Sequence, residues 1–253
     1  MKNKILLSLL LSAMGTYSAS LSADEWSYQL EPYLMVTSID GDATIGRTNE
    51  TDVDVDFGTI LDNLDAAAMV HFEAHHDSGW GVVFDYGFMD LGGNKTDANG
   101  NSTDVGVRQG VLELQALYRN KLSDGFLDYF AGIRWWDNDI DLTLDYTIRP
   151  ENNFKKEIES DWIDPVVGVR WIRNIDDKWT FLAQADIGGF GLGSDFTSSV
   201  QSGVMYKISD LMTLDLKYKA TWVDFDEGTK GQQGYFGYDT VTHGTVIGLA
   251  FNF

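Results

Sequence analysis

The last seven residues, Ile247-Gly248-Leu249-Ala250-Phe251-Asn252-Phe253, decide the fold. The large apolar side chains among them, Ile247, Leu249, Phe251 and Phe253, alternate with small or polar ones. This two-residue period is typical of a strand with one apolar face. A strand in a water-soluble protein gains little from ending on an exposed Phe, because chain ends fray. We therefore expect the apolar face of this strand to meet lipid.

The other end of the sequence has the composition of an export signal. Lys2 and Lys4 precede a short apolar run, and small residues follow it up to Ala23. We predict a cleaved signal peptide over residues 1–23 and one mature domain over residues 24–253. Loss of the two lysines would change the formal charge from -21 to -23. So acidic a chain is not expected to bind nucleic acid, because it offers no basic patch to phosphates.

Composition narrows the fold class further. The chain has no cysteine, which excludes disulfides and thiolate metal sites. After the signal, no apolar run approaches the roughly 18 to 20 residues that a membrane-spanning helix needs. Only 3 prolines, 26 glycines and 13% aromatic residues favour an all-β domain of many strands and tight turns.

Ten segments of the sequence have strand-like alternation, and the connections between them differ in length. Short turns follow the even-numbered segments, whereas longer polar stretches follow most of the odd-numbered ones, and this is the pattern of an outer-membrane barrel. We predict a transmembrane antiparallel up-and-down β-barrel of about ten strands. Eight or twelve strands remain open, because residues 43–57 could form an extra hairpin. The segments are 26–38, 65–76, 79–90, 105–119, 126–142, 160–173, 178–190, 197–207, 211–224 and 240–253.

The two faces of these strands differ in chemistry. One face carries apolar and aromatic side chains that lipid would accept, and the other is polar. Eight polar side chains are expected to line the barrel interior or a pore. They would form either a closed ion-paired core or a narrow water-filled path that selects small solutes. The eight are His71, Glu73, Asp85, Glu113, Arg134, Arg170, Asp186 and Lys217.

The sequence also suggests roles for two tryptophans, for the last aromatic residues and for one helical segment. Trp136 and Trp162 point inward at the outer mouth, where they would pack on each other or grip a ligand ring. Phe251 and Phe253 form an expected assembly signal for the barrel-assembly machinery. Residues 57–64 look helical, with Asp56 as the cap, and would form either a lid over the mouth or a helix at the membrane surface.

No motif predicts catalysis, a metal site or a cofactor. The acidic run Asp137 to Asp141 lacks the glycine and glutamate of a calcium loop. Asp239 and His243 are the one Asp/His pair that could be nominated for catalysis, and alternation places them on the outward face. Outer-membrane lipid and lipopolysaccharide are the other expected partners, and the sequence leaves the oligomeric state open.

Several phrases of the sequence resemble a group of proteobacterial outer-membrane β-barrel proteins that are loosely OmpA-like or OmpW-like in size. The phrases are Asp52 to Asp65, Trp162 to Trp171 and Asp186 to Asp195. The resemblance implies the barrel fold and a place in the outer membrane of a Gram-negative cell, and it carries over no reaction, ligand or catalytic residue.

The function expected from the sequence is that of a non-enzymatic, integral outer-membrane barrel. It would serve as a narrow, porin-like channel or as a structural barrel with an ion-paired interior. An outer-membrane enzyme that acts on lipid or peptide at the mouth, and a surface receptor or adhesin that acts through its loops, are the alternatives.

Overall fold

The structure of the chain is a computed structural model. It describes residues 25–46, 51–97, 99–145, 153–232 and 234–253. The expected signal peptide, residues 1–23, lies outside these ranges.

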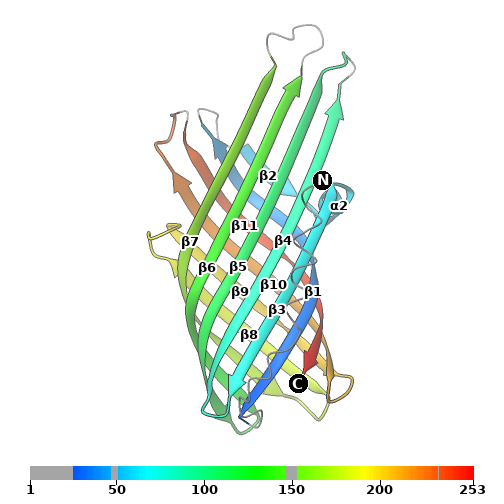
Figure 1. The fold of residues 1–253 in the computed structure, drawn as a ribbon, viewed down its shortest axis with the longest axis vertical. Helices are drawn as coiled ribbons and strands as arrows, with labels where there is room; N and C mark the ends of the chain where they lie inside the picture. The colour runs from blue at the N-terminus through cyan, green and yellow to red at the C-terminus, as the bar shows by residue number, and fades with distance from the viewer. Residues whose placement is uncertain (1–24, 47–50, 98, 146–152, 233) are drawn as a thin grey trace, which may run out of the picture.

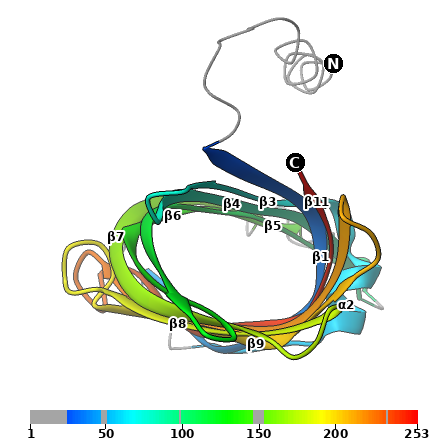
Figure 2. The ribbon, with the colours of Figure 1, turned by 90° about the horizontal axis from the view of Figure 1, so that it is seen from below.

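Antiparallel strands close into a barrel in which each strand from β3 to β10 pairs with the next one along the chain and β1 pairs with β3 (Figures 1 and 2). Strand β1 pairs with β11, and this pairing closes the ring. The predicted up-and-down β-barrel is therefore confirmed. The strands are β1 (Trp26–Ile45), β2 (Thr51–Val55), β3 (Leu64–His76), β4 (Trp80–Thr96), β5 (Ser102–Leu122), β6 (Gly125–Asp145), β7 (Phe154–Asn174), β8 (Trp179–Gly189), β9 (Phe196–Lys207), β10 (Met212–Glu227) and β11 (Phe236–Asn252).

Residues 43–57, where the sequence left an extra hairpin open, contribute one short additional strand. β2 pairs with Ile39–Ala43 of β1, while β3 pairs with Trp26–Pro32 of the same strand. Helix α2 (Phe57–Asp62) joins β2 to β3, and the Asp56 side chain caps it by accepting a hydrogen bond from the Thr59 N–H at 2.8 Å. No helix in the described part of the chain has the length and apolar character to cross a membrane.

The wall of the barrel is uneven in height. Strands β5, β6 and β7 have 21 residues each, whereas β8 and β9 have 11 and 12. In Figure 1 the β8–β9 connection accordingly lies well below the tips of β5 to β7. We call the end of the barrel with the long loops the outer end, and the end with the short turns the turn end. The long strands extend past the predicted segments at the outer end.

Alternation divides the side chains of each strand between the two faces of the wall. On β11, Ile247 is 48% exposed on the outward face, whereas Val246 and Ala250 are buried on the inward face. Gly244 lies where β1 approaches most closely: a Cβ atom there would be 1.9 Å from the Val36 carbonyl oxygen. A larger residue would push the two strands apart, so the closed wall needs glycine at this position.

Candidate functional site: the barrel interior

The eight residues expected to line the interior are buried or half-buried, and they fall into three charged groups. Arg134, Glu113 and Asp186 form the first group. Arg170 joins Glu73, His71 and Asp85 in the second. Lys217 belongs to a third group with two residues that were not among the eight, Asp215 and Glu31.

Arg134 is the centre of the first group and has 0% exposure. It stands opposite Glu113 in the β5–β6 ladder, and its Nε donates to Glu113 Oε1 at 3.1 Å. Its Nη2 donates to both oxygens of Asp186 at 3.1 Å, and its Nη1 donates to Thr197 Oγ1 at 3.0 Å. One guanidinium thus joins four strands, β5, β6, β8 and β9. Acceptors on three sides bind its planar set of N–H donors.

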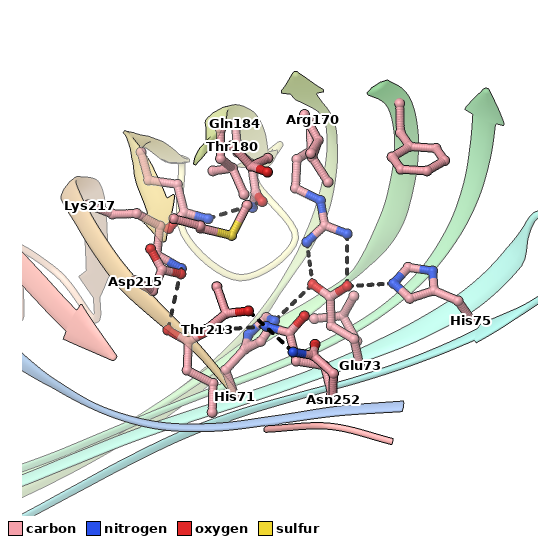
Figure 3. Close-up of a pocket in the computed structure, with 18 of the residues that line it drawn as sticks. His71, Glu73, His75, Arg170, Thr180, Gln184, Thr213, Asp215, Lys217 and Asn252 are labelled. Carbon is pink, nitrogen blue, oxygen red and sulfur yellow. Dashed lines mark hydrogen bonds and ion pairs between the residues drawn. The ribbon is translucent and has the colours of Figure 1, made fainter. Parts of the chain in front are cut away.

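The second group reaches across the lumen from β7 to β3 (Figure 3). Both terminal nitrogens of Arg170 donate to Glu73, and Arg170 Nε donates to Asp128 at 3.0 Å. The His71 ring lies between two carboxylates, with Nδ1 2.9 Å from Asp85 Oδ2 and Nε2 2.8 Å from Glu73 Oε1. Ionised carboxylates only accept hydrogen bonds, so this geometry fits a doubly protonated, positively charged His71.

The third group leaves two buried oxygens without a hydrogen-bond partner. Lys217 Nζ lies 2.6 Å from Asp215 Oδ2 and 3.7 Å from Glu31 Oε1. Glu31 Oε1 and Asp215 Oδ1 are buried atoms that no described group satisfies. Both residues line a large cavity that opens toward the turn end and has a volume of about 1010 Å³. Water in that cavity can supply the missing hydrogen bonds.

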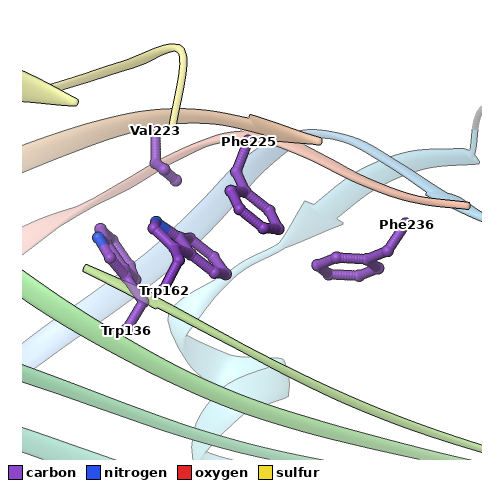
Figure 4. Packing of buried hydrophobic residues seen from close by; sticks show 5 residues of the cluster. All are labelled: Trp136, Trp162, Val223, Phe225 and Phe236. Atoms are coloured by element: carbon purple, nitrogen blue, oxygen red, sulfur yellow. The ribbon is translucent and has the colours of Figure 1, made fainter. Parts of the chain in front are cut away.

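An apolar cluster fills the lumen on the outer side of the charged groups (Figure 4). The Trp136 and Trp162 rings are stacked with their centroids 5.6 Å apart, and Trp162 stacks on Phe225 at 3.8 Å. Both indole N–H groups donate to Asp164 Oδ2 at 3.1 Å. The two tryptophans therefore pack on each other and on β10.

Sequence reasoning missed three interior residues that complete these groups. Glu31 and Tyr33 lie on β1, where the Tyr33 hydroxyl donates to Asp85 Oδ1 at 2.9 Å. Thr197 on β9 accepts from Arg134. The alternation of Glu31 and Tyr33 with Leu30 and Leu34 was the available signal for β1. Thr197 gave none, because a threonine fits either face of a strand.

The outward face carries one hydrogen-bonded histidine. His243 Nε2 lies 2.7 Å from Asp40 Oδ2, and His243 Nδ1 lies 2.7 Å from the Tyr218 hydroxyl. Asp40, and not the nominated Asp239, is therefore the carboxylate partner of His243. Ser38 stands opposite His243 in the β1–β11 ladder, and no hydrogen bond joins these two side chains.

The remaining expectations concern α2, metals and the assembly signal. The capped helix is present over Phe57–Asp62, with Ile60 buried and Leu61 55% exposed. Within the described residues, no three His, Asp or Glu side chains gather as a metal-binding group. Phe251 is half-buried and Phe253 is 63% exposed at the turn end.

Comparison with known proteins identifies the fold. No family model matches this sequence, and no curated protein matches it. Among solved structures, the chain is similar to the outer membrane protease OmpT from Escherichia coli, with a TM-score of 0.56, 9% identity, and coverage of 91% of this chain and 97% of OmpT. It is also similar to the translocator domain of the autotransporter NalP from Neisseria meningitidis, with a TM-score of 0.50, 10% identity, and coverage of 98% and 93%. At this identity the likeness establishes the fold, which is that of outer-membrane β-barrels.

Proposed function

We propose that the protein is an integral, non-enzymatic outer-membrane barrel whose lumen is closed between a turn-end chamber and the outer mouth. Of the two functions that the sequence left open, this is the structural barrel with an ion-paired interior. Its expected surroundings are outer-membrane lipid and lipopolysaccharide, and the loops at the outer end would face outward.

The outward face of the wall supports the membrane placement. Large apolar side chains stand exposed along the strands, and a contiguous apolar surface of this extent marks a membrane or protein contact. Lipid can accept such a wall where neighbouring strands are paired, because paired strands satisfy one another's backbone groups. Examples from four strands are Phe84, Leu114, Val167 and Leu216.

One observation carries the proposal of closure: the Arg134 side chain has no contact with solvent. A water-filled path along the lumen would wet the charged groups in its wall. Arg134 is instead enclosed by Glu113, Asp186 and Thr197, and the cluster of Trp136 and Trp162 covers the outer side.

Single-channel recording in a planar bilayer tests the closure. The mature protein is expected to give no steady openings, whereas Arg134→Ala, which leaves Asp186 without its ion-pair partner and Glu113 with Lys219 alone, is expected to give brief cation-selective ones. Trp135→Ala, on the outward face, is the matched control and should stay silent. Steady openings of the unaltered protein, with an ion selectivity that changes in Arg134→Ala, would contradict the closed barrel and would indicate a solute channel.

A lipid-acting enzyme is the rival function, favoured by the bonded set of Asp40, His243 and Tyr218 on the outward face. His243 Nδ1 binds the Tyr218 hydroxyl, and no described serine is hydrogen-bonded to the ring, so the set has a carboxylate-oriented histidine but not the serine nucleophile of acyl transfer. We expect phospholipid vesicles to show no ester hydrolysis above background. Hydrolysis that is lost in both Asp40→Ala and His243→Ala would establish the enzyme.

A further inference from the structure

Strand β1 loses its partner on one side over six residues. β1 pairs with β3 as far as Pro32 and Val70, and it pairs with β2 from Ile39 and Val55 outward. Between these pairs, Tyr33–Ser38 have no partner in β2 or β3, although β11 pairs with them on the other side. The chain leaves the wall here to form α2. The β1–β3 seam is therefore interrupted in its outer half.

Exposure on the two edges agrees with this interruption. Ala67 on β3 stands opposite Met89 on β4 and shares its inward face. Met89 is buried, yet Ala67 is exposed. On the other edge, Leu34 is 66% exposed, more than most large apolar residues of the wall. Small and apolar side chains thus border an opening in the wall.

A cavity of about 90 Å³ lies behind the opening. β1 contributes Tyr33, Met35 and Thr37 to its lining, and β3 contributes Met69, so residues from both edges of the gap line it. Trp136 borders the same cavity, whose outer side is closed by the apolar cluster that includes this residue. Asp85, Glu113 and Lys219 also line it, and they belong to the charged groups on the turn side.

The edge of β1 is polar along its backbone. Tyr28 exchanges both of its backbone hydrogen bonds with Phe253 on the β11 side, so alternate residues, Tyr33, Met35 and Thr37, direct theirs to the gap. The Thr37 hydroxyl donates to the Met35 carbonyl at 3.1 Å. Unpaired backbone groups cost several kcal/mol each in hydrocarbon. The site therefore combines a polar backbone rim with a cavity that Met69, Met89 and Val111 line with apolar side chains and that charged groups close on the turn side.

We propose that the gap and the cavity form a side-entry site for one hydrocarbon chain of an amphiphile, either a membrane lipid or a free fatty acid. The chain end occupies the cavity, and the polar end stays at the rim near Ser38 and α2. An apolar cavity of about 150 Å³ holds benzene, so this cavity holds roughly four carbons. The inference rests on the proposed placement of the barrel in a bilayer.

Gly87 offers a way to fill the cavity. It lines the space, and the one atom within 4 Å of a Cβ atom added there is the Tyr33 hydroxyl oxygen, at 3.9 Å. The Cβ atom of Gly87→Leu therefore meets no backbone, and we expect the rest of the side chain to enter the cavity. It should leave the barrel folded and exclude the chain.

Cysteine labelling tests the site, because the chain contains no cysteine of its own. Met69→Cys places a thiol at the cavity, and Ala67→Cys places one on the same edge of the gap. Ser199→Cys is the matched control: it is inward-facing and buried, but its strand is paired on both sides. Each variant is refolded in phosphatidylcholine vesicles. The reagents are a maleimide at the end of a fatty-acid chain, the same maleimide at the chain end of a phospholipid, and a water-soluble sulfonated maleimide.

We expect the fatty-acid reagent to label Met69→Cys at least tenfold faster than Ser199→Cys, and Gly87→Leu to remove most of that difference. Additional labelling by the phospholipid reagent identifies membrane lipid as a source, whereas labelling by the fatty-acid reagent alone identifies the free acid. Equal rates at Met69, Ala67 and Ser199, or faster labelling by the sulfonated reagent, would overturn the site. A heat-dependent shift in gel migration of the same samples reports whether the barrel has folded in the vesicles. Failure of the proposed membrane barrel is therefore distinguished from failure of the proposed side-entry site.

Discussion

Arg170 on β7 and Glu73 on β3 form a two-point ion pair across the lumen, although 97 residues separate them in the chain. Each partner is held by others: Asp128 accepts from Arg170, and His71 and His75 contact the same Glu73 carboxylate. Because these side chains come from different parts of the ring, the pair fixes the cross-section of the barrel as well as its charge.

Arg170→Ala should destabilise the barrel strongly, because it removes the guanidinium that joins the buried Glu73 and Asp128 and leaves only Arg119 on Asp128 and the two histidines on Glu73. The expected loss is about 3 to 5 kcal/mol in the free energy of unfolding, measured by urea unfolding in lipid vesicles. Arg173→Ala is the matched control, since Arg173 pairs with Asp124 at 2.9 Å while 54% exposed. An exposed pair contributes about 0 to 1 kcal/mol. Similar losses in the two variants would contradict the structural role of the buried pair.

Part of this arrangement was predictable from the sequence. Alternation identified the inward face of most strands, and turn length, which sets hairpin register, predicts His71 opposite Asp85, as β3 and β4 have them. The same reasoning places Arg134 diagonal to Glu113, whereas the two stand directly opposite in the β5–β6 ladder. The Arg170–Glu73 pair joins strands that are not neighbours, and its formation depends on the closed cross-section. Local patterns contain no information about such a contact.

The outer ends of the strands were less predictable for a different physical reason. Residues 143–145 and 154–159 continue β6 and β7 beyond the predicted segments, and Lys155, Lys156 and Glu157 put charged side chains on both faces of β7, which weakens the alternation that marks a half-buried strand. β2 does alternate, but with five residues it is too short for its partner to be predicted, and it pairs with the outer part of β1. Strand pairing at these positions is set by the neighbouring strands.

Trp162→Ala should open the apolar cluster at the outer side of the lumen. The indole stacks on Phe225 with an interplanar angle of 6° and donates to Asp164, so truncation removes both packing and a hydrogen bond. Large-to-small changes of this kind cost about 3 to 5 kcal/mol. Trp135→Ala, on the outward face and 36% exposed, should cost clearly less. Urea midpoints in the same vesicles compare the two, and equal losses would mean that the cluster is loosely packed.

Asp176→Asn should weaken the β7–β8 turn in a pH-dependent manner. The backbone N–H groups of Lys178 and Trp179 donate to the Asp176 carboxylate and lower its pKa below the usual value. For a carboxyl group with a lowered pKa, the stabilisation is present above the pKa of the unfolded chain and is lost as the pH falls through that of the folded protein.

The urea midpoint of Asp176→Asn should therefore lie below that of the unaltered protein at pH 7, and the difference should shrink as the pH falls below about 4, the ordinary value for an aspartate. Asp177→Asn removes the same charge from the next position of the turn. Its carboxylate accepts no hydrogen bond from the described residues, so its effect should be small. A constant difference across the pH range would rule out the carboxylate as the cause.

Phe253→Ala should separate assembly of the barrel from its stability. The backbone of Phe253 exchanges hydrogen bonds with Tyr28 at 2.8 and 3.0 Å, and these bonds do not depend on the side chain. The ring is 63% exposed and stacks on Tyr28 at 5.9 Å, so its loss should change the unfolding free energy by about 0.5 kcal/mol or less. If the terminal aromatic residue is an assembly signal, insertion into vesicles that contain the barrel-assembly machinery should slow several-fold, while unassisted insertion stays unchanged. Leu249→Ala, on the same outward face four residues before Phe253, is the control for the loss of apolar surface. Equal slowing in the two variants would show that the machinery does not recognise Phe253 specifically.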